Sequence, residues 1–388
     1  MKALGDVRVL DLGGFITGPF AALLLAEMGA DVIKVEWPGK GDKFRGAAGG
    51  LYSPQFQAHN RHKRSITLDY ASSAGREVLH ALVRSADVLV SNARPGVMAR
   101  IGADWPHLEA VNPRLVYCAI TGFGADGPYA DRPAFDNVGQ ALSGWMSRHR
   151  RGDDPRVVGP ALADPVTSLY AALGIVAALR ERDRTGKGRF VEVNMIEAMI
   201  GLSIDPITTF FVSGRPTPVL ERAANSQAYN LTCRDGRRIG LHVSMLDKFF
   251  QGLARAVERP EWIERYPRTR DRVRGYEVLA DELAAIFATR DRDHWVARLE
   301  QEVVPFGIEN EVQDLENDPQ IRHLDVFYEI AHPKYGQTKA PRRPVRIDGS
   351  REIDARPPPD LGEHTDEVLA EIGFTGVQIA ELKSKGVV

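Results

Sequence analysis

The chain has 388 residues, of which 43% are hydrophobic, and its 50 basic and 52 acidic side chains leave a net charge of −2. This length allows a large core and suggests two domains, or one large domain with an insertion. The balanced charge excludes a bulk attraction to nucleic acid or to an acidic membrane, so any site for anions has to be local. We expect neither a nucleic-acid partner nor a membrane partner.

Three features predict a cytoplasmic location. Cys118 and Cys233 lie far apart, form no CxxC motif and imply no disulfide framework. The start of the chain, MKALGDVRVLDL, lacks the charged and apolar regions of a signal peptide. Charged, Gly and Pro residues also break the longest apolar stretches well before the roughly 18 residues that a membrane span requires.

The first third of the sequence alternates between strand and helix patterns. Strands are predicted at residues 7–12, 31–36, 65–70, 87–92 and 114–121, and helices at 20–28 and 76–86. Such alternation is typical of an α/β fold with a parallel sheet and right-handed crossovers. The first turn carries Gly13, Gly14 and Gly18, and their spacing does not match the G-x-G-x-x-G motif of a dinucleotide site.

The pattern of predicted secondary structure changes in the later part of the sequence. A long apolar helix from Pro165 is followed by a strand at 189–195 and another helix, but residues 228–243 read as a hairpin around Asp235-Gly236. Polar helices containing Trp262 and Trp295 follow.

We therefore predict a large Rossmann-like domain and a smaller α+β domain. The large domain comprises residues 1–200 and 326–388, the small one comprises 225–325, and 201–224 form a linker.

One carboxylate, Asp164, lies directly before Pro165 and ahead of the apolar helix. Asp followed by Pro is a favoured start of a helix, with the carboxylate as N-cap. The same position also suits a carboxylate nucleophile, because a helix N-terminus would keep it ionised at neutral pH. The flanking GPALAD is small and apolar, so substrate could approach closely. The local sequence is compatible with both interpretations.

Six segments, in this order and spacing, carry a resemblance that runs nearly end to end. They are VRVLDLGGFITGPFAALLLAEMGADVIKVEWPGKGDKFRG, NRHKRSITLDY, ADVLVSNARPGVMARIG, NPRLVYCAITGFGADGPYADRPAFDNVGQALSG, RTGKGRFVEVNMIEAM and GEHTDEVLAEIGF. The chain closely resembles the family III CoA-transferases, a group that includes formyl-CoA transferase, the carnitine-CoA transferases and α-methylacyl-CoA racemase.

The resemblance implies that Asp164 is the nucleophile of a ping-pong reaction that passes through a mixed anhydride and an aspartyl-CoA thioester. Coenzyme A would be a co-substrate, with no metal and no tightly bound cofactor. Racemases of the group use a His-Asp pair where this chain has Phe135-Asp136, and phenylalanine cannot carry a proton. Asp136 matches an acidic residue near the nucleophile of the transferases, or it caps the segment NVGQAL.

The resemblance also implies a path for coenzyme A. Ile16 and Thr17 would line the pantetheine, Leu68 would pack near the adenine, and Asn92, Arg94 and Arg100 would face the nucleotide end. Trp37 stands where oxalate-handling members have an arginine, which removes one phosphate contact. Each arginine taken alone is more often a solvated surface charge, and we interpret the basic run NRHKRS as a solvated face.

Three classes of function remain in view: a CoA-transferase, a racemase or isomerase on the same scaffold, and a non-catalytic acyl-CoA-binding protein. Ile16 replaces a glutamine of the formyl-CoA transferases, and residues 220–230 lack their glycine run, which favours a larger acid than formate or oxalate, such as a dicarboxylate or a branched acid. The family forms interlocked homodimers, so we expect one here, with extended connections at 201–224 and 326–345 reaching around the partner.

Overall fold

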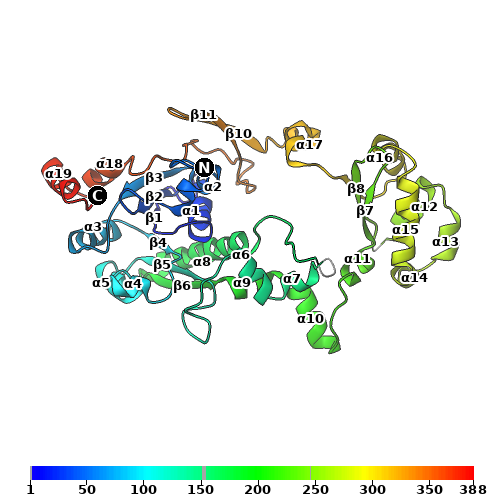
Figure 1. The fold of residues 1–388 in the computed structure, drawn as a ribbon, viewed down its shortest axis with the longest axis horizontal. Helices are drawn as coiled ribbons and strands as arrows, with labels where there is room; N and C mark the ends of the chain where they lie inside the picture. The colour runs from blue at the N-terminus through cyan, green and yellow to red at the C-terminus, as the bar shows by residue number, and fades with distance from the viewer. Residues whose placement is uncertain (1, 151–153, 245) are drawn as a thin grey trace. The chain divides into compact units, whose positions relative to one another are not determined.

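The computed structural model describes residues 2–150, 154–244 and 246–388, and these form two compact units (Figure 1). The larger unit contains the chain up to Ile207 together with Asp325–Val388, and the smaller unit is Thr208–Leu324. The second boundary lies within two residues of the expected one, but residues 201–224, expected as a linker, are divided between the two units at Ile207 and Thr208.

The larger unit is built on six parallel strands. They are β1 (Arg8–Asp11), β2 (Asp31–Glu36), β3 (Lys63–Thr67), β4 (Val88–Ser91), β5 (Val116–Thr121) and β6 (Arg189–Asn194). Their order in the sheet is β3-β2-β1-β4-β5-β6, with Val9 of β1 paired to Val32 on one side and to Val88 on the other. This order is that of a doubly wound Rossmann sheet, so the α/β prediction for this unit is confirmed.

Helices cover both faces of this sheet, because successive strand residues point to opposite sides. Val9 belongs to the core beneath α1 (Thr17–Glu27) and α8 (Ala163–Thr185), whereas the next residue, Leu10, belongs to the core of the other face. That second face is covered by α3 (Ser73–Arg84), α5 (Trp105–Val111), α18 (Thr365–Glu371) and α19 (Gly376–Ser384). The C-terminal segment thus completes the first unit, as expected.

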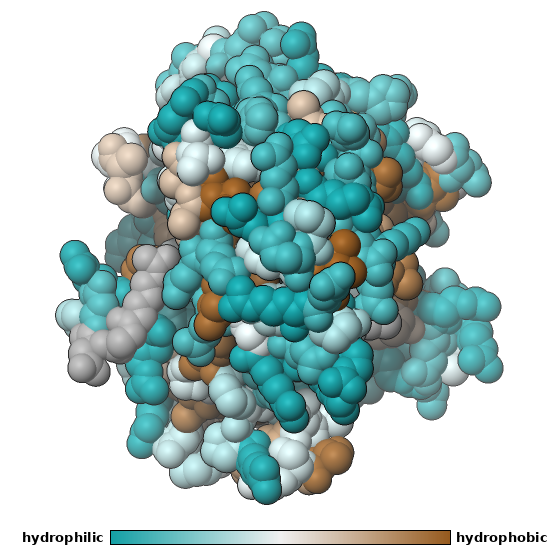
Figure 2. Space-filling model, turned by 90° about the vertical axis from the view of Figure 1, so that its right-hand side faces the viewer, coloured by the Kyte–Doolittle hydropathy of each residue, from teal (hydrophilic) through white to brown (hydrophobic). Residues whose placement is uncertain are grey.

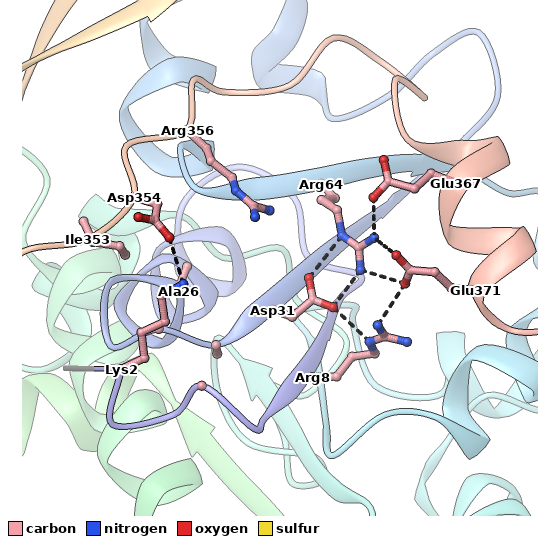
Figure 3. Close-up of a pocket in the computed structure, with 13 residues that line it drawn as sticks. Lys2, Arg8, Ala26, Asp31, Arg64, Ile353, Asp354, Arg356, Glu367 and Glu371 are labelled. Atoms are coloured by element: carbon pink, nitrogen blue, oxygen red, sulfur yellow. Dashed lines mark hydrogen bonds and ion pairs between the residues drawn. The ribbon is translucent and has the colours of Figure 1, made fainter.

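An ion-paired cluster at the amino ends of the strands holds α18 in place (Figure 3). The guanidinium of Arg64, which is buried, lies 2.7 Å from Asp31, 2.8 Å from Glu367 and 2.6 Å from Glu371. Arg8 adds a contact of 2.9 Å to Glu371. The arginines of β1 and β3 are therefore neutralised by Asp31 of β2 and by the glutamates of α18.

Shorter elements complete the larger unit. They are η1 (Lys43–Gly46), α2 (Pro54–Asn60), α4 (Val97–Arg100), α6 (Asp136–Leu142), α7 (Trp145–Arg148), α9 (Met195–Leu202) and the hairpin β10 (Phe327–His332) with β11 (Gly336–Pro341).

The smaller unit has an antiparallel sheet of β7 (Ala228–Thr232), β8 (Arg238–His242) and β9 (Phe306–Ile308). The predicted hairpin is confirmed, with Thr232 opposite Arg238 and Gly236 in the left-handed turn at φ 78°. Its helices are α11 (Glu221–Ser226), α12 (Asp247–Ala256), α13 (Glu261–Arg265), α14 (Thr269–Arg274), α15 (Tyr276–Phe287), α16 (Arg292–Gln301), η2 (Val312–Asn317) and α17 (Pro319–His323). Trp262 and Trp295 are buried in its core. The face of the molecule drawn in Figure 2 is mostly hydrophilic.

The expectation of extended connections is wrong. Residues 201–224 contain α10 (Ile204–Ser213) and the start of α11, and residues 326–345 contain the β10–β11 hairpin. The helix follows from the spacing of Ile204, Ile207 and Phe211, which is a helical repeat. Among the described residues, no single helix is long and apolar enough to cross a membrane; α9 and α10 meet that test only as a pair, which is bent by 73°.

Candidate active site

A cavity of about 320 Å³ opens beyond the carboxyl ends of β1, β4 and β5. The residues that line it are Phe15, Ile16, Thr17, Lys43, Asn92–Pro95, Ile120–Gly122, Ala130, Arg132–Phe135, Asp164 and Met195. In a doubly wound sheet this is where ligands bind, because the strand order reverses between β1 and β4 and leaves a crevice there. The fold thus brings together five residues selected from the sequence: Ile16, Thr17, Asn92, Arg94 and Asp164.

Asn92, at the end of β4, holds the turn that enters α1. Its side-chain oxygen accepts a hydrogen bond from the backbone N–H of Gly14 at 3.0 Å, and its amide nitrogen donates to the Gly14 carbonyl at 2.7 Å. The same nitrogen donates to the Thr17 hydroxyl at 2.9 Å. Asn92 therefore fixes the shape of the cavity wall that Ile16 and Thr17 form.

Buried charges support this turn from below. The ammonium of Lys34 donates to the Gly13 carbonyl at 2.9 Å and lies 3.0 Å from Asp42. Lys63 lies 2.8 Å from Asp11, and all four side chains are buried. Burial lowers the pKa of Lys63 to about 8, against the opposing effect of Asp11. Asp42 in turn accepts the backbone N–H of Phe15 at 3.1 Å, a residue held in the left-handed region at φ 63°.

This network corrects the interpretation of NRHKRS as a solvated face. Every residue of the run, from Asn60 to Ser65, is buried. Its charges are paired with carboxylates that are distant in the sequence: Arg61 with Glu27, Lys63 with Asp11, and Arg64 with Asp31. Asp11 and Lys34 are charged residues within largely apolar strands. Such residues are the feature of the sequence that could have predicted buried ion pairs.

Asp164 lies in the first turn of α8 but does not cap it. The helix begins at Ala163, the N-cap position is Leu162, and no side chain there makes a capping hydrogen bond. The N-cap interpretation is therefore wrong. No described residue donates a hydrogen bond to the Asp164 carboxylate, which faces the cavity. Burial, and then the charge of Asp136, raise the pKa of Asp164 to about 7. Desolvation therefore opposes the stabilisation of the charge that was expected from the helix N-terminus.

Asp136 provides the cap that Asp164 does not. One of its oxygens accepts the backbone N–H groups of Leu162 at 2.7 Å and of Asp164 at 3.0 Å. Its other oxygen accepts a hydrogen bond from Gln140. Asp136 is absent from the cavity lining and acts through the start of α8. It lies beside Asp164, as the resemblance implied, but it does not cap NVGQAL, because the N-cap position of α6 is Phe135 and carries no capping hydrogen bond. Ser168 adds a bond of 2.9 Å to the Thr17 carbonyl, which ties α8 to α1.

Two predicted residues lie elsewhere. Leu68 is completely buried in the core beneath α3 and does not line this cavity. Arg100 is exposed at the end of α4 and does not line the cavity. Trp37 is partly exposed and packs against Tyr70, with ring centroids 4.8 Å apart.

Three cations surround the cavity, and two of them were not predicted. Arg94 was expected, while Lys43 and Arg132 were missed because nothing in their local sequence distinguishes them from surface residues. None of the three forms an ion pair with a described residue, although Arg132 stacks on the ring of Tyr129 at 3.8 Å. A cavity with unpaired cations and one carboxyl group suits an anionic ligand. Among the described residues, no group of three or more His, Cys, Asp and Glu side chains could hold a metal ion.

Comparisons with known proteins agree on one relationship. A model of CoA-transferase family III matches residues 4–365. The succinyl-CoA:glutarate CoA-transferase of Mus musculus is 31% identical, over 96% of this chain and 87% of the mouse protein. The formyl-CoA:oxalate CoA-transferase of Rhodopseudomonas palustris is 32% identical, over 99% and 97% respectively. The crystal structure of a CAIB/BAIF family protein from Brucella suis matches with a TM-score of 0.84 and 32% identity, covering 95% of this chain and 99% of that one.

Proposed function

The chain belongs to CoA-transferase family III and is a CoA-transferase, and we propose that it transfers coenzyme A between carboxylic acids by ping-pong chemistry at Asp164. One observation carries this proposal: the Asp164 carboxyl group faces the cavity at the crevice of the sheet, with no hydrogen-bond donor among the described residues to occupy it. A carboxylate without a structural partner is available as a nucleophile.

The proposed reaction has four steps that regenerate the enzyme. Ionised Asp164 attacks the thioester carbonyl of the donor, the C–S bond breaks, and a mixed anhydride and free CoA thiolate form. The thiolate attacks the aspartyl carbonyl, so the donor acid leaves and an aspartyl-CoA thioester remains. The acceptor carboxylate then displaces the thiolate to give a second anhydride. Thiolate attack on the acceptor carbonyl finally releases the new acyl-CoA and the Asp164 carboxylate.

Residues of this chain supply binding and positioning for those steps. Arg94 at the end of β4 would meet a phosphate of coenzyme A, since guanidinium groups bind phosphate in a bidentate manner. Ile16 and Thr17 would line the pantetheine beside the N-terminus of α1. Asp136, by fixing the first turn of α8, would hold the Asp164 carbonyl where the thiolate arrives.

Trapping experiments test this assignment. The protein is incubated with an acyl-CoA, treated with hydroxylamine or borohydride, and analysed by intact mass and peptide mapping. We expect modification at Asp164 alone, and Asp164→Ala should abolish exchange while coenzyme A still binds. Exchange that survives this substitution would refute the mechanism. Loss of α-deuterium to solvent without CoA exchange would instead indicate a racemase.

We also propose that the protein acts as a homodimer in the cytoplasm. On α8, Leu169, Leu173 and Val176 are 54%, 64% and 43% exposed and form one stripe along the helix. An apolar stripe of this kind is typical of a protein interface, and two copies of this chain would cover it symmetrically. Light scattering after size exclusion should give twice the mass of 42.8 kDa, and a monomer at micromolar concentration would contradict the proposal.

A further inference from the structure

One wall of the cavity has a composition that coenzyme A binding does not explain. It consists of Phe15, which follows β1, Lys43, which lies in η1 after β2, and Phe135, which precedes α6. The Lys43 ammonium lies 5.6 Å from the centre of the Phe15 ring, within the range of a cation–π contact. No described carboxylate pairs with it.

The two aromatic side chains form an apolar surface in front of this ammonium. Their ring centroids are 6.0 Å apart in an edge-to-face arrangement, and Phe44 supports Phe15 from behind at 5.3 Å. Phe15 is held by its bond to Asp42, in a backbone conformation that costs energy for a non-glycine residue. Phe135 is 62% exposed. Exposed aromatic surface inside a cavity is typical of a binding site for a carbon chain.

The three cations of the cavity come from different loops. Arg94 follows β4 and Arg132 follows β5, whereas Lys43 follows β2, and β2 and β4 flank β1 on opposite sides. Arg94 is the expected phosphate ligand, and the guanidinium of Arg132 is stacked on Tyr129. Lys43 has the looser ring contact, at 5.6 Å from the centre of Phe15, and its side chain is exposed, so it is the cation best able to reach a charge on the acyl group itself.

We propose that Lys43 binds the distal carboxylate of a dicarboxylic acid whose other carboxylate reacts at Asp164, with Phe15 and Phe135 holding the carbon chain between them. This rests on the proposed CoA transfer at Asp164. Because donor and acceptor acids occupy the same place in turn in a ping-pong cycle, the contact acts on both. The substrates are thus short dicarboxylic acids and their mono-CoA thioesters.

Binding measured without chemistry tests this assignment. In an Asp164→Asn background no anhydride forms, and the affinities for succinyl-CoA and butyryl-CoA, which share a four-carbon acyl chain and differ by one carboxylate, are measured by calorimetry. Adding Lys43→Met should weaken succinyl-CoA binding roughly 10- to 100-fold, the usual worth of a charged hydrogen bond, and butyryl-CoA binding far less. Lys43→Arg should retain most of the preference. Lys40→Met is the matched control, since Lys40 is exposed and outside the cavity lining, and it should change neither affinity.

The outcomes separate this inference from the proposed function. Equal weakening of both thioesters by Lys43→Met, or no weakening of either, would overturn the role of Lys43. Selective loss for succinyl-CoA would support it even if the unmodified protein never forms an adduct at Asp164, a result that would refute only the covalent mechanism. With active protein, Lys43→Met should also raise the KM for succinate and glutarate as acceptors much more than it lowers kcat.

Discussion

Charged residues cluster at both ends of the strands of the six-stranded sheet, here called its amino edge and its carboxyl edge, but they have different partners at the two edges. At the amino edge, Arg64 and Arg8 are fully engaged with Asp31, Glu367 and Glu371 (Figure 3). At the carboxyl edge, Lys43, Arg94, Arg132 and Asp164 line a cavity and form no ion pair with a described residue. Paired charges fasten one part of the chain to another, whereas unpaired charges in a cavity are available for a ligand. The comparison predicts that substitutions at the first edge change stability and that those at the second change catalysis.

Of the substitutions at the carboxyl edge, Asp164→Asn should have the largest effect on activity. Loss of the nucleophile should reduce CoA exchange by at least ~10⁴-fold. The folded state raises the pKa of this carboxyl to about 7, so it binds a proton more tightly than the unfolded chain does. The ionised group therefore costs stability above pH 7, and this cost disappears as the pH falls below about 4. The variant should be more stable than the unmodified protein at pH 8, by about 1 to 3 kcal/mol.

Thermal or urea unfolding at pH 8 and at pH 4 measures this gain. It should be present at pH 8 and nearly absent at pH 4. A variant that loses both activity and stability at pH 8 would show that Asp164 has a structural role that its contacts do not reveal.

At the other edge, Arg64→Ala should be the most damaging substitution. It removes the cation that Asp31, Glu367 and Glu371 share and leaves only Arg8, which contacts Asp31 and Glu371, so we expect a loss of about 2 to 4 kcal/mol in the free energy of unfolding. The fraction of the Arg64→Ala protein that remains folded should still form the Asp164 adduct at a near-normal rate. Urea unfolding and adduct formation are measured together. Arg356→Ala is the control, because Arg356 is exposed and lines the same cavity as Arg8, Asp31 and Arg64 (Figure 3). If Arg64→Ala removed activity and left stability unchanged, the amino edge would serve catalysis and not stability, which would contradict the prediction.

The same contrast explains what could be predicted from the sequence. The alternation of apolar strands and helices is local and led to the sheet, and the Asp235-Gly236 pair, which is also local, led to the hairpin. Asp164 and Asn92 were identified because motifs surround them. The pairing of Lys63 with Asp11 joins residues 52 positions apart, and no local pattern distinguishes such a buried lysine from a surface one. Lys43 was missed for the same reason, since only the fold brings it to the cavity.

The pH dependence of the reaction provides a finer test. Because only ionised Asp164 attacks the thioester, the rate of adduct formation should fall about tenfold per pH unit below 7 and level off above pH 8. Single-turnover rates across pH 5 to 9 measure the midpoint. A flat profile between pH 5 and 8 would mean that the nucleophile titrates well below 7, or that another group reacts.

The smallest effect, and the most specific, is expected from Asp136→Asn. The amide oxygen of asparagine can still accept the N–H groups of Leu162 and Asp164, so the start of α8 is retained while the negative charge is removed. Since that charge is the second cause of the raised pKa of Asp164, after burial, the midpoint of the pH–rate profile should move to lower pH without reaching the value of a free aspartate. The variant should then be faster than the unmodified protein at pH 6 and within about threefold of it at pH 8. A midpoint that stays in place, with the rate reduced at every pH, would show that Asp136 contributes through its hydrogen bonds alone.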